Sequence, residues 1–149
     1  MYNKILVPLD GSKRAEAILP HAEEMAKRYD AEIIFLRVEE LYVMLEWDEV
    51  VDLAQCHEKF DERKKVSESY LAKLKTEFEN KGIQADARVV QGPVVESILT
   101  IAEELSADVI IMASHGLSGF SRTFYGSVTA GVLQRIDRPI LVIRTRRIE

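Results

Sequence analysis

Apolar residues along this chain alternate between short unbroken runs and longer helical stripes. Five runs have the length of a β-strand, and in the segments between them apolar residues recur every three or four positions. The expected strands cover residues 4–9, 33–38, 85–89, 107–112 and 139–143. Because two parallel strands need a long crossover connection, strands that alternate with helices predict a parallel sheet covered on both faces, an α/β fold.

Four helical stripes lie between these strands. The first follows Ser12, a suitable N-cap, and two others cover the apolar positions of residues 94–105 and 128–136. The longest is predicted over residues 60–81 and ends at Gly82, a residue typical of helix C-termini. Its expected buried face carries four residues spaced by four: Val66, Tyr70, Leu74 and Phe78.

The polarity of the strands indicates which of them lie at the edges of the sheet. Residues 85–89 alternate polar and apolar side chains, so we expect this strand at an edge. The last strand, Ile140–Ile143, is wholly apolar and would be a liability at an exposed edge. A second copy of the chain could cover it, which predicts a homodimer through this strand.

Length and composition restrict the class of protein. A chain of 149 residues is suited to one domain, here residues 1–149. A net charge of -5 argues against general binding of nucleic acid, which requires a basic face. The single cysteine, Cys56, excludes an internal disulfide. No apolar run approaches the length of a membrane span and no signal peptide is evident, so we expect a cytoplasmic protein with no membrane partner.

The most informative stretch for ligand chemistry follows the fourth strand. Ala113-Ser114-His115-Gly116 leads into a loop, and Gly126-Ser127-Val128 opens the last helix. Small residues there leave backbone N–H groups bare, and the hydroxyl of Ser127 and a helix N-terminus lie beside them. An anion is attracted by all of these groups, and a nucleotide phosphate is the anion most often held in this way.

A second loop with suitable chemistry follows the first strand. It reads Pro8-Leu9-Asp10-Gly11-Ser12. In an open parallel sheet, ligands bind at the carboxyl ends of the strands, where the strand order reverses. The two loops meet only if the first and fourth strands are neighbours, and the residue pattern alone leaves this order open.

Taken together, these segments resemble the universal stress protein family over the whole chain. The resemblance lies in Val-Pro-Leu-Asp-Gly-Ser at the end of the first strand, in the Gly92-Pro93 turn, in residues 110–116 with Gly126-Ser127-Val128, and in the closing residues 138–143. It implies an open, Rossmann-like five-stranded sheet in the order 3-2-1-4-5, with helices on both faces. It also implies dimerisation through the last strand, in agreement with the edge argument.

The resemblance to the ATP-binding members implies a site for ATP, alone or with Mg²⁺. Asp10, with the backbone around Pro8 and Leu9, would hold the adenine and ribose side, and Val38 would line the adenine pocket. Met112 and Ala113 would pack against the ribose. Gly116, Gly126, Ser127 and Val128 would offer N–H and hydroxyl donors to the phosphates, and His115 would belong to the same binding site. Each residue also has a plainer interpretation: Asp10 as a turn residue or helix cap, Ser127 as an N-cap, Val38 and Met112 as core.

One position departs from the motif of the ATP-binding members. That motif is Gly, two residues, Gly, nine residues, then Gly followed by Ser or Thr, and this chain has Ala113 in place of the first glycine. If the glycine serves only for close approach of the ligand, alanine is tolerated. If the position needs a left-handed backbone, the site is weakened. We expect retained binding.

Other chemistry has weaker support in the sequence. Ser114 and His115 are adjacent, which rarely gives a nucleophile and its base, and no third member is evident. His21 and His57 have no metal-ligand spacing, and the chain carries no P-loop lysine motif. We therefore expect a nucleotide-binding stress-response or signalling module with no catalytic residue assigned, and at most slow ATP hydrolysis. The alternatives are a nucleotide-free dimeric interaction protein and a weak hydrolase that uses Ser114, His115 or Asp10.

Overall fold

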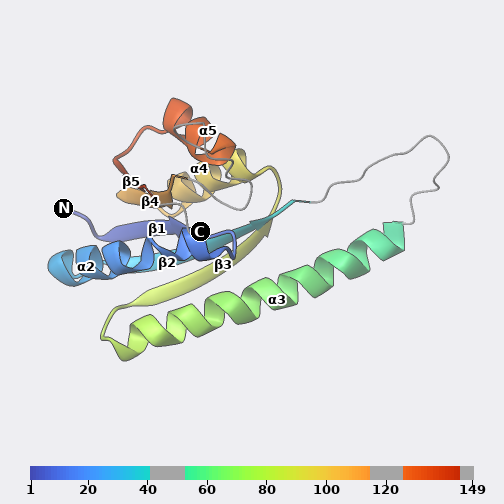
Figure 1. The fold of residues 1–149 in the computed structure, drawn as a ribbon, viewed down its shortest axis with the longest axis horizontal. Helices are drawn as coiled ribbons and strands as arrows, with labels where there is room; N and C mark the ends of the chain where they lie inside the picture. The colour runs from blue at the N-terminus through green and yellow to red at the C-terminus, as the bar shows by residue number, and fades with distance from the viewer. Residues whose placement is uncertain (41–52, 115–125, 145–149) are drawn as a thin grey trace.

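The computed structural model describes residues 1–40, 53–114 and 126–144, and its centre is a parallel sheet (Figure 1). The five strands lie in the order β3-β2-β1-β4-β5, as the family resemblance implied. Their bounds are β1 (Lys4–Pro8), β2 (Glu32–Glu39), β3 (Ala85–Gln91), β4 (Val109–Ala113) and β5 (Ile140–Ile143). The polar β3 and the apolar β5 are the two edges of the sheet, so the edge position predicted for the polar strand is confirmed.

Helices cover both faces of this sheet (Figure 1). They are α1 (Lys13–Glu16), α2 (Leu19–Tyr29), α3 (Leu53–Asn80), α4 (Val94–Glu104) and α5 (Ser127–Arg135). The first three pack on one face and the last two on the other, since each group shares a separate hydrophobic core with the sheet. The strands therefore bury side chains on both faces, which explains their unbroken apolar runs.

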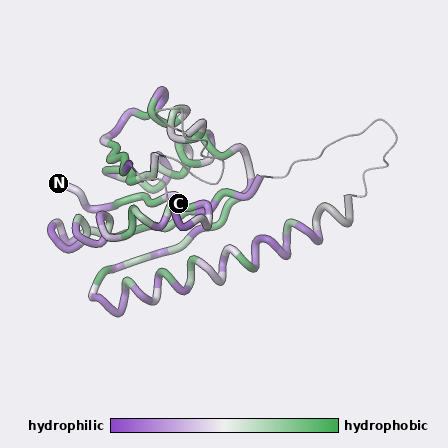
Figure 2. Tube along the Cα trace, in the orientation of Figure 1, coloured by the Kyte–Doolittle hydropathy of each residue, from purple (hydrophilic) through white to green (hydrophobic). Residues whose placement is uncertain are grey.

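Alternation along β1 shows how the two cores are built. Ile5 and Val7 point to the core under α1, α2 and α3, and Leu6 points to the core under α4 and α5. All three side chains are fully buried. Figure 2 shows the corresponding hydrophobic colouring along the strands and the polar colouring along the outer helices. The sheet is therefore a rigid base for whatever lies at its ends.

The first helix differs from the prediction because it is divided in two. Ser12 does cap it, and its Oγ accepts the N–H of Ala15 at 3.1 Å. However, α1 ends at Glu16, and α2 begins at Leu19. Pro20 lies in the first turn of α2, where its missing N–H and its ring are tolerated, whereas in the interior of one long helix they would break the hydrogen-bonding pattern.

The buried face predicted for the long helix was wrong at one position. Val66 is 71% exposed, while Leu71, Leu74 and Phe78 are buried. A step of four residues turns a helix about 40° past a full turn, so a series of fours drifts off one face. Ser67 and Leu71 take the buried positions at the N-terminal side of this face.

Two strands extend further than their hydrophobic runs. The pairing of β2 with β3 continues to Glu39 opposite Gln91, beyond the predicted ends at residues 38 and 89. Backbone hydrogen bonds do not depend on side-chain polarity, so charged residues can continue a strand past its apolar run. The charged residues Arg37 and Glu39 therefore both belong to β2 and lie at the carboxyl edge of the sheet, close to the end of β1. No helix among the described residues is long and apolar enough to cross a membrane.

Candidate functional site

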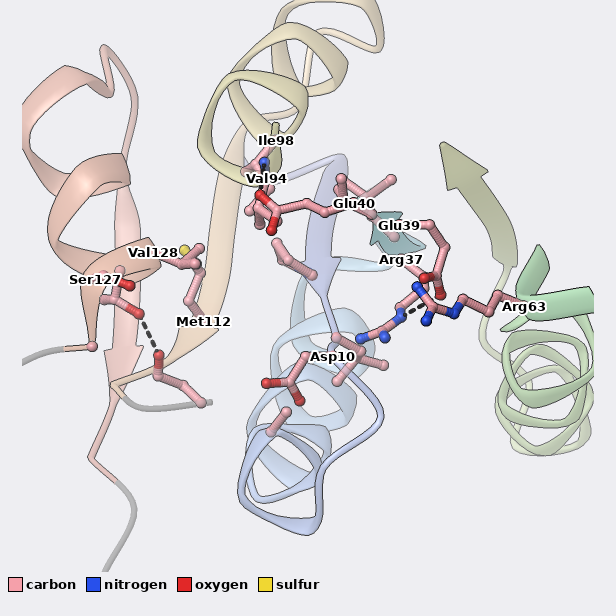
Figure 3. A pocket seen from close by; sticks show the side chains of 18 residues that line it. Asp10, Arg37, Glu39, Glu40, Arg63, Val94, Ile98, Met112, Ser127 and Val128 are labelled. Atoms are coloured by element: carbon pink, nitrogen blue, oxygen red, sulfur yellow. Dashed lines mark hydrogen bonds and ion pairs between the residues drawn. The ribbon is translucent and has the colours of Figure 1, made fainter. Parts of the chain in front are cut away.

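A pocket of about 420 Å³ lies at the carboxyl ends of β1, β2 and β4. Helices α3, α4 and α5 and the short α1 complete its wall (Figure 3). This is the point where the strand order reverses, with β1 flanked by β2 on one side and β4 on the other. An open α/β sheet binds its ligands at such a position.

Most of the predicted site residues line this pocket. They come from the ends of β1, β2 and β4 and from the start of α5: Pro8, Leu9, Asp10, Val38, Met112, Ala113, Gly126, Ser127 and Val128. His115 and Gly116 lie outside the described residues. Segments about a hundred residues apart in the sequence are thus brought to one cavity.

The N-terminus of α5 forms one side of the pocket. Gly126 is its N-cap and makes no side-chain capping hydrogen bond, so no side chain of the cap residue covers the first N–H groups of the helix. Ser127 is the first helical residue, which rules out the plainer interpretation of it as the N-cap. Free N–H groups and the helix dipole make this end attractive to an anion.

Two hydrogen bonds fix α5 against the end of β4. The N–H of Gly126 donates to the carbonyl of Ser114 at 2.7 Å, and the hydroxyl of Thr129 donates to the carbonyl of Ala113 at 2.8 Å. Thr129 is itself buried. The helix end is therefore held in a defined position relative to the strand.

A second helix N-terminus at the pocket already has an anionic partner. The N–H of Val94, the first residue of α4, donates to Oε1 of Glu40 at 3.2 Å (Figure 3). Glu40 thus supplies the negative charge that this helix end favours. Among the described residues, the N-terminus of α4 thus has a carboxylate partner, whereas the N-terminus of α5 has no side-chain cap.

Asp10 closes a turn and also lines the pocket. Its Oδ1 accepts the N–H of Ser12 at 2.9 Å, which closes a turn in which Gly11 has a φ of 82°. Asp10 also lines the pocket, between α5 on one side and the end of β2 on the other (Figure 3). The turn therefore holds the carboxylate at the opening of the site.

The conformation of Ala113 shows whether this position needs a left-handed backbone. It lies in β4, paired with Ile143 of β5, in an extended conformation. The non-glycine residues with positive φ in the described part of the chain are Asp30 and Ser106. Ala113 therefore needs no left-handed backbone, and the remaining effect of its methyl group is the space it occupies.

Sequence reasoning missed the polar wall opposite α5. Arg37 and Glu39 of β2 and Arg63 of α3 line the pocket there (Figure 3). The Nε of Arg37 donates to Oε1 of Glu39 at 3.1 Å, and the hydroxyl of Ser67 donates to the same oxygen at 2.6 Å. The signal was alternation: Arg37 and Glu39 continue the odd-numbered face of β2, but the predicted strand ended at Val38, and Arg37 inside it was not considered as a site residue.

A half-buried phenol links two of the helices that complete the wall of the pocket. The hydroxyl of Tyr70 on α3 donates to Oε1 of Glu16 on α1 at 2.7 Å. Burial raises the pKa of Tyr70, and the neighbouring carboxylates of Glu16 and Asp10 raise it further. The phenol therefore stays protonated as a hydrogen-bond donor and links α3 to α1.

One of the alternative hydrolase residues, Ser114, is poorly placed for catalysis. Ser114 is 2% exposed and is not part of the pocket lining, and its backbone pairs with Ile143 and Gly126. A nucleophile must reach its substrate, so burial of this hydroxyl argues against that role. Within the described residues, no group of three or more His, Cys, Asp or Glu side chains could hold a metal ion.

The sheet and its pocket define a class of protein. An open, doubly wound parallel sheet with a pocket at its switch point is a Rossmann-like α/β protein built to bind a small ligand. Comparison with known proteins then identifies the family. The chain belongs to the universal stress protein family, whose family model matches residues 1–144.

Individual relatives match over nearly their full length. The chain is 31% identical to universal stress protein MJ0577 of Methanocaldococcus jannaschii, covering 98% of this chain and 97% of that protein. It is also 31% identical to universal stress protein YxiE of Bacillus subtilis, covering 97% and 100%.

Solved structures show the same fold. The structure of MJ0577 has a TM-score of 0.87 at 30% identity, covering 99% of each chain. The universal stress protein UspA of Lactobacillus plantarum has a TM-score of 0.80 at 21% identity, covering 97% of this chain and 98% of that one. A universal stress protein in complex with cAMP has a TM-score of 0.65 at 19% identity, covering 97% and 98%.

Proposed function

We propose that this protein binds ATP at the carboxyl ends of β1 and β4 and acts as a nucleotide-dependent stress-response or signalling module. The observation that carries the proposal is the contrast between the two helix ends at the pocket. Glu40 occupies the N-terminus of α4, while the N-terminus of α5 has no capping side chain at Gly126. A ligand with phosphate groups matches this distribution of charge.

The pocket residues give each part of a nucleotide a place. The phosphates would be held by Gly126, Ser127 and Val128, whose N–H groups and hydroxyl are donors. Asp10 would accept hydrogen bonds from ribose hydroxyl groups. The adenine would lie at the β2 side against Val38, which lines the pocket with the apolar Val94 and Ile98. Met112 and Ala113 would pack against the ribose.

Relatives with the same fold support an adenine nucleotide as the ligand class. One universal stress protein is in complex with cAMP, and a universal stress protein of Archaeoglobus fulgidus is in complex with dAMP. Mg²⁺ would enter with the phosphates, because the described residues offer no cluster of ligands for it. The extended backbone of Ala113 supports retained binding despite the missing glycine.

We propose that the bound state itself is the output. The described pocket residues include no histidine or cysteine, and Ser114 is buried away from the pocket, so hydrolysis would be slow at most. Donors at α5 could still stabilise a transferring phosphoryl group to a small extent. The proposed location is the cytoplasm, where ATP is abundant.

The edge strand β5 supports a homodimer as a further part of the proposal. All four residues of Ile140–Ile143 are partly exposed although all are apolar. Its outer edge is unpaired in the single chain, and a second copy would cover the apolar residues and pair the backbone. A monomer in sedimentation at micromolar concentration would contradict this arrangement.

One experiment separates ATP binding from the alternative of a nucleotide-free dimer. The purified protein is denatured and its supernatant examined for adenine nucleotide by mass spectrometry, and melting is then measured with and without Mg-ATP. Ligand at 100 times its dissociation constant adds about 2.7 kcal/mol to the free energy of unfolding, which raises Tm by several degrees. No co-purified nucleotide and no change in Tm at saturation would leave the nucleotide-free dimer as the function.

A further inference from the structure

The pocket has a second polar end, opposite the anion-binding end at α5. Ser127, Val128 and Met112 lie at one end, and Arg37, Glu39 and Arg63 lie at the other, with Asp10 between them (Figure 3). The strand order separates the two ends in the same way, because β1 lies between β4 and β2. Phosphates held at α5 therefore leave the nucleoside half of a ligand facing Arg37.

A buried carboxylate fixes Arg37 in this position. Only 7% of Glu39 is exposed, and its Oε1 accepts hydrogen bonds from Arg37 Nε and from Ser67 Oγ. Ser67 is also buried, and it comes from α3, while Arg37 and Glu39 lie two residues apart on the same face of β2. Glu39 of β2 and Ser67 of α3 thus set the direction of the guanidinium group of Arg37.

This arrangement is costly if it serves stability alone. A buried ion pair loses hydration that its mutual attraction only partly returns, so hydrophobic residues at the same positions would do as well. Glu39 accepts the Nε–H of Arg37, and within the described residues no hydrogen bond uses the four N–H groups on the two terminal nitrogens of Arg37. The side chain of Arg37 is 21% exposed and lines the pocket, so these donors can reach a ligand there.

We propose that Arg37 is a specificity-determining residue that contacts the nucleoside half of the bound nucleotide, and that Glu39 and Ser67 are its positioning residues. The inference rests on the proposed nucleotide function and adds to it the residue that recognises the part of the ligand away from the phosphates. A guanidinium group only donates hydrogen bonds, so it matches the acceptor nitrogens of a purine ring and the ribose oxygens.

The test compares ligands that share a nucleoside and differ in phosphate number. Affinities for ATP, ADP, AMP and adenosine are measured by calorimetry for the wild-type chain and for Arg37→Ala. One lost hydrogen bond from a charged donor weakens binding about tenfold. Because the contact is to the nucleoside, the factor is expected to be the same for all four ligands. A loss that grows with phosphate number would make Arg37 a phosphate-binding residue and overturn the proposal, as would an unchanged affinity.

Ser67 separates positioning from direct contact. Ser67→Ala removes one hydrogen bond to Glu39 but changes no residue of the pocket lining, since Ser67 itself is not part of it. We expect a loss of about threefold in affinity in the wild-type background and no loss in the Arg37→Ala background, because Ser67 acts through Arg37. Equal losses in both backgrounds would show a merely structural role.

Controls keep the outcomes distinct. Arg88→Ala removes an exposed arginine from β3 outside the pocket and should leave all four affinities unchanged. Should Arg37→Ala fail to fold because Glu39 is left buried without its partner, the neutral pair Arg37→Gln with Glu39→Gln replaces it, with the same expected loss. Failure of the wild-type chain to bind any of the ligands would refute the proposed function itself, whereas normal wild-type binding with an unaffected Arg37 variant refutes only this inference.

Discussion

The N–H of Gly126 donates to the carbonyl oxygen of Ser114 at 2.7 Å, which joins the start of α5 to the end of β4. This bond sets where the anion-attracting end of the helix lies relative to the sheet. Ser114 is in turn held by Ile143 of the edge strand, whose carbonyl accepts its N–H at 2.9 Å. The phosphate end of the proposed site is thus continuous with the strand proposed to form the dimer.

Gly126→Val is expected to abolish ATP binding while the fold survives. The residue has a φ of -66° and a ψ of 163°, a conformation open to any residue, so a side chain adds no backbone strain. A branched side chain would instead occupy space at the α5 end of the pocket, where phosphate approaches. We expect at least a hundredfold loss of affinity by calorimetry, about 2.7 kcal/mol, with Tm changed by only a few degrees. Retained affinity would mean that the phosphates lie elsewhere.

Ala113→Gly is expected to bind ATP as tightly as the wild-type chain, or more tightly. The methyl group faces the proposed ribose position, and its removal can only add space. The same change should cost about 0.5–1 kcal/mol in the free energy of unfolding, because glycine loses more freedom in a strand. Calorimetry and urea unfolding measure the two effects separately. Weaker binding would contradict the role given to this position.

The sheet could be predicted from the sequence because burial on both faces leaves unbroken apolar runs. Leu6, Phe35 and Ile110 lie in three neighbouring strands, and all three side chains are fully buried. Their order could not be derived in the same way. Hydrophobic pattern shows that a strand has two buried faces, but not which strand lies beside it, and the order came from the family resemblance.

The site was predicted where glycine and small residues marked a loop, and was missed where charged residues continue a strand. Gly126 and Asp10 stand out in the sequence because loops of this chemistry are rare. Arg37 and Glu39 look like an exposed end of a strand, and only the long-range hydrogen bond from Ser67 makes them part of a site. A contact between residues 28 positions apart leaves no local pattern.

Acid is expected to destabilise the protein partly through Asp108. Its Oδ2 accepts the N–H groups of Lys4 and Asn3 at 2.9 and 2.7 Å, and these bonds hold the pKa of Asp108 below its usual value. A pKa that is lower in the folded state gives stability that is present above the unfolded value of 3.8 and is lost as the pH falls through the folded value.

Asp108→Asn tests this contribution. At pH 7 the variant should lose about 1 kcal/mol in the free energy of unfolding, a modest figure because the carboxylate is partly exposed to solvent. Near pH 2 the difference from the wild-type chain should shrink, since the wild-type carboxyl is then protonated as well. Urea unfolding at both pH values measures it. A difference that stays constant with pH would assign the effect to packing.

The orientation of α3 predicts very different losses in the free energy of unfolding for substitutions at two neighbouring turns. Leu71 is fully buried against the sheet, whereas Val66 is 71% exposed, although a simple four-residue step had placed Val66 on the buried face. Leu71→Ala should therefore cost about 3 kcal/mol in the free energy of unfolding, through lost apolar contact and the cavity left behind. Val66→Ala should change it by less than about 0.5 kcal/mol, because the side chain is mostly in water and alanine favours a helix.

Urea unfolding of both variants gives the comparison, and Leu74→Ala serves as a second buried control on the same helix. A large loss at Val66 with a small one at Leu71 would show that α3 is rotated from the position that brings Ser67 to Glu39.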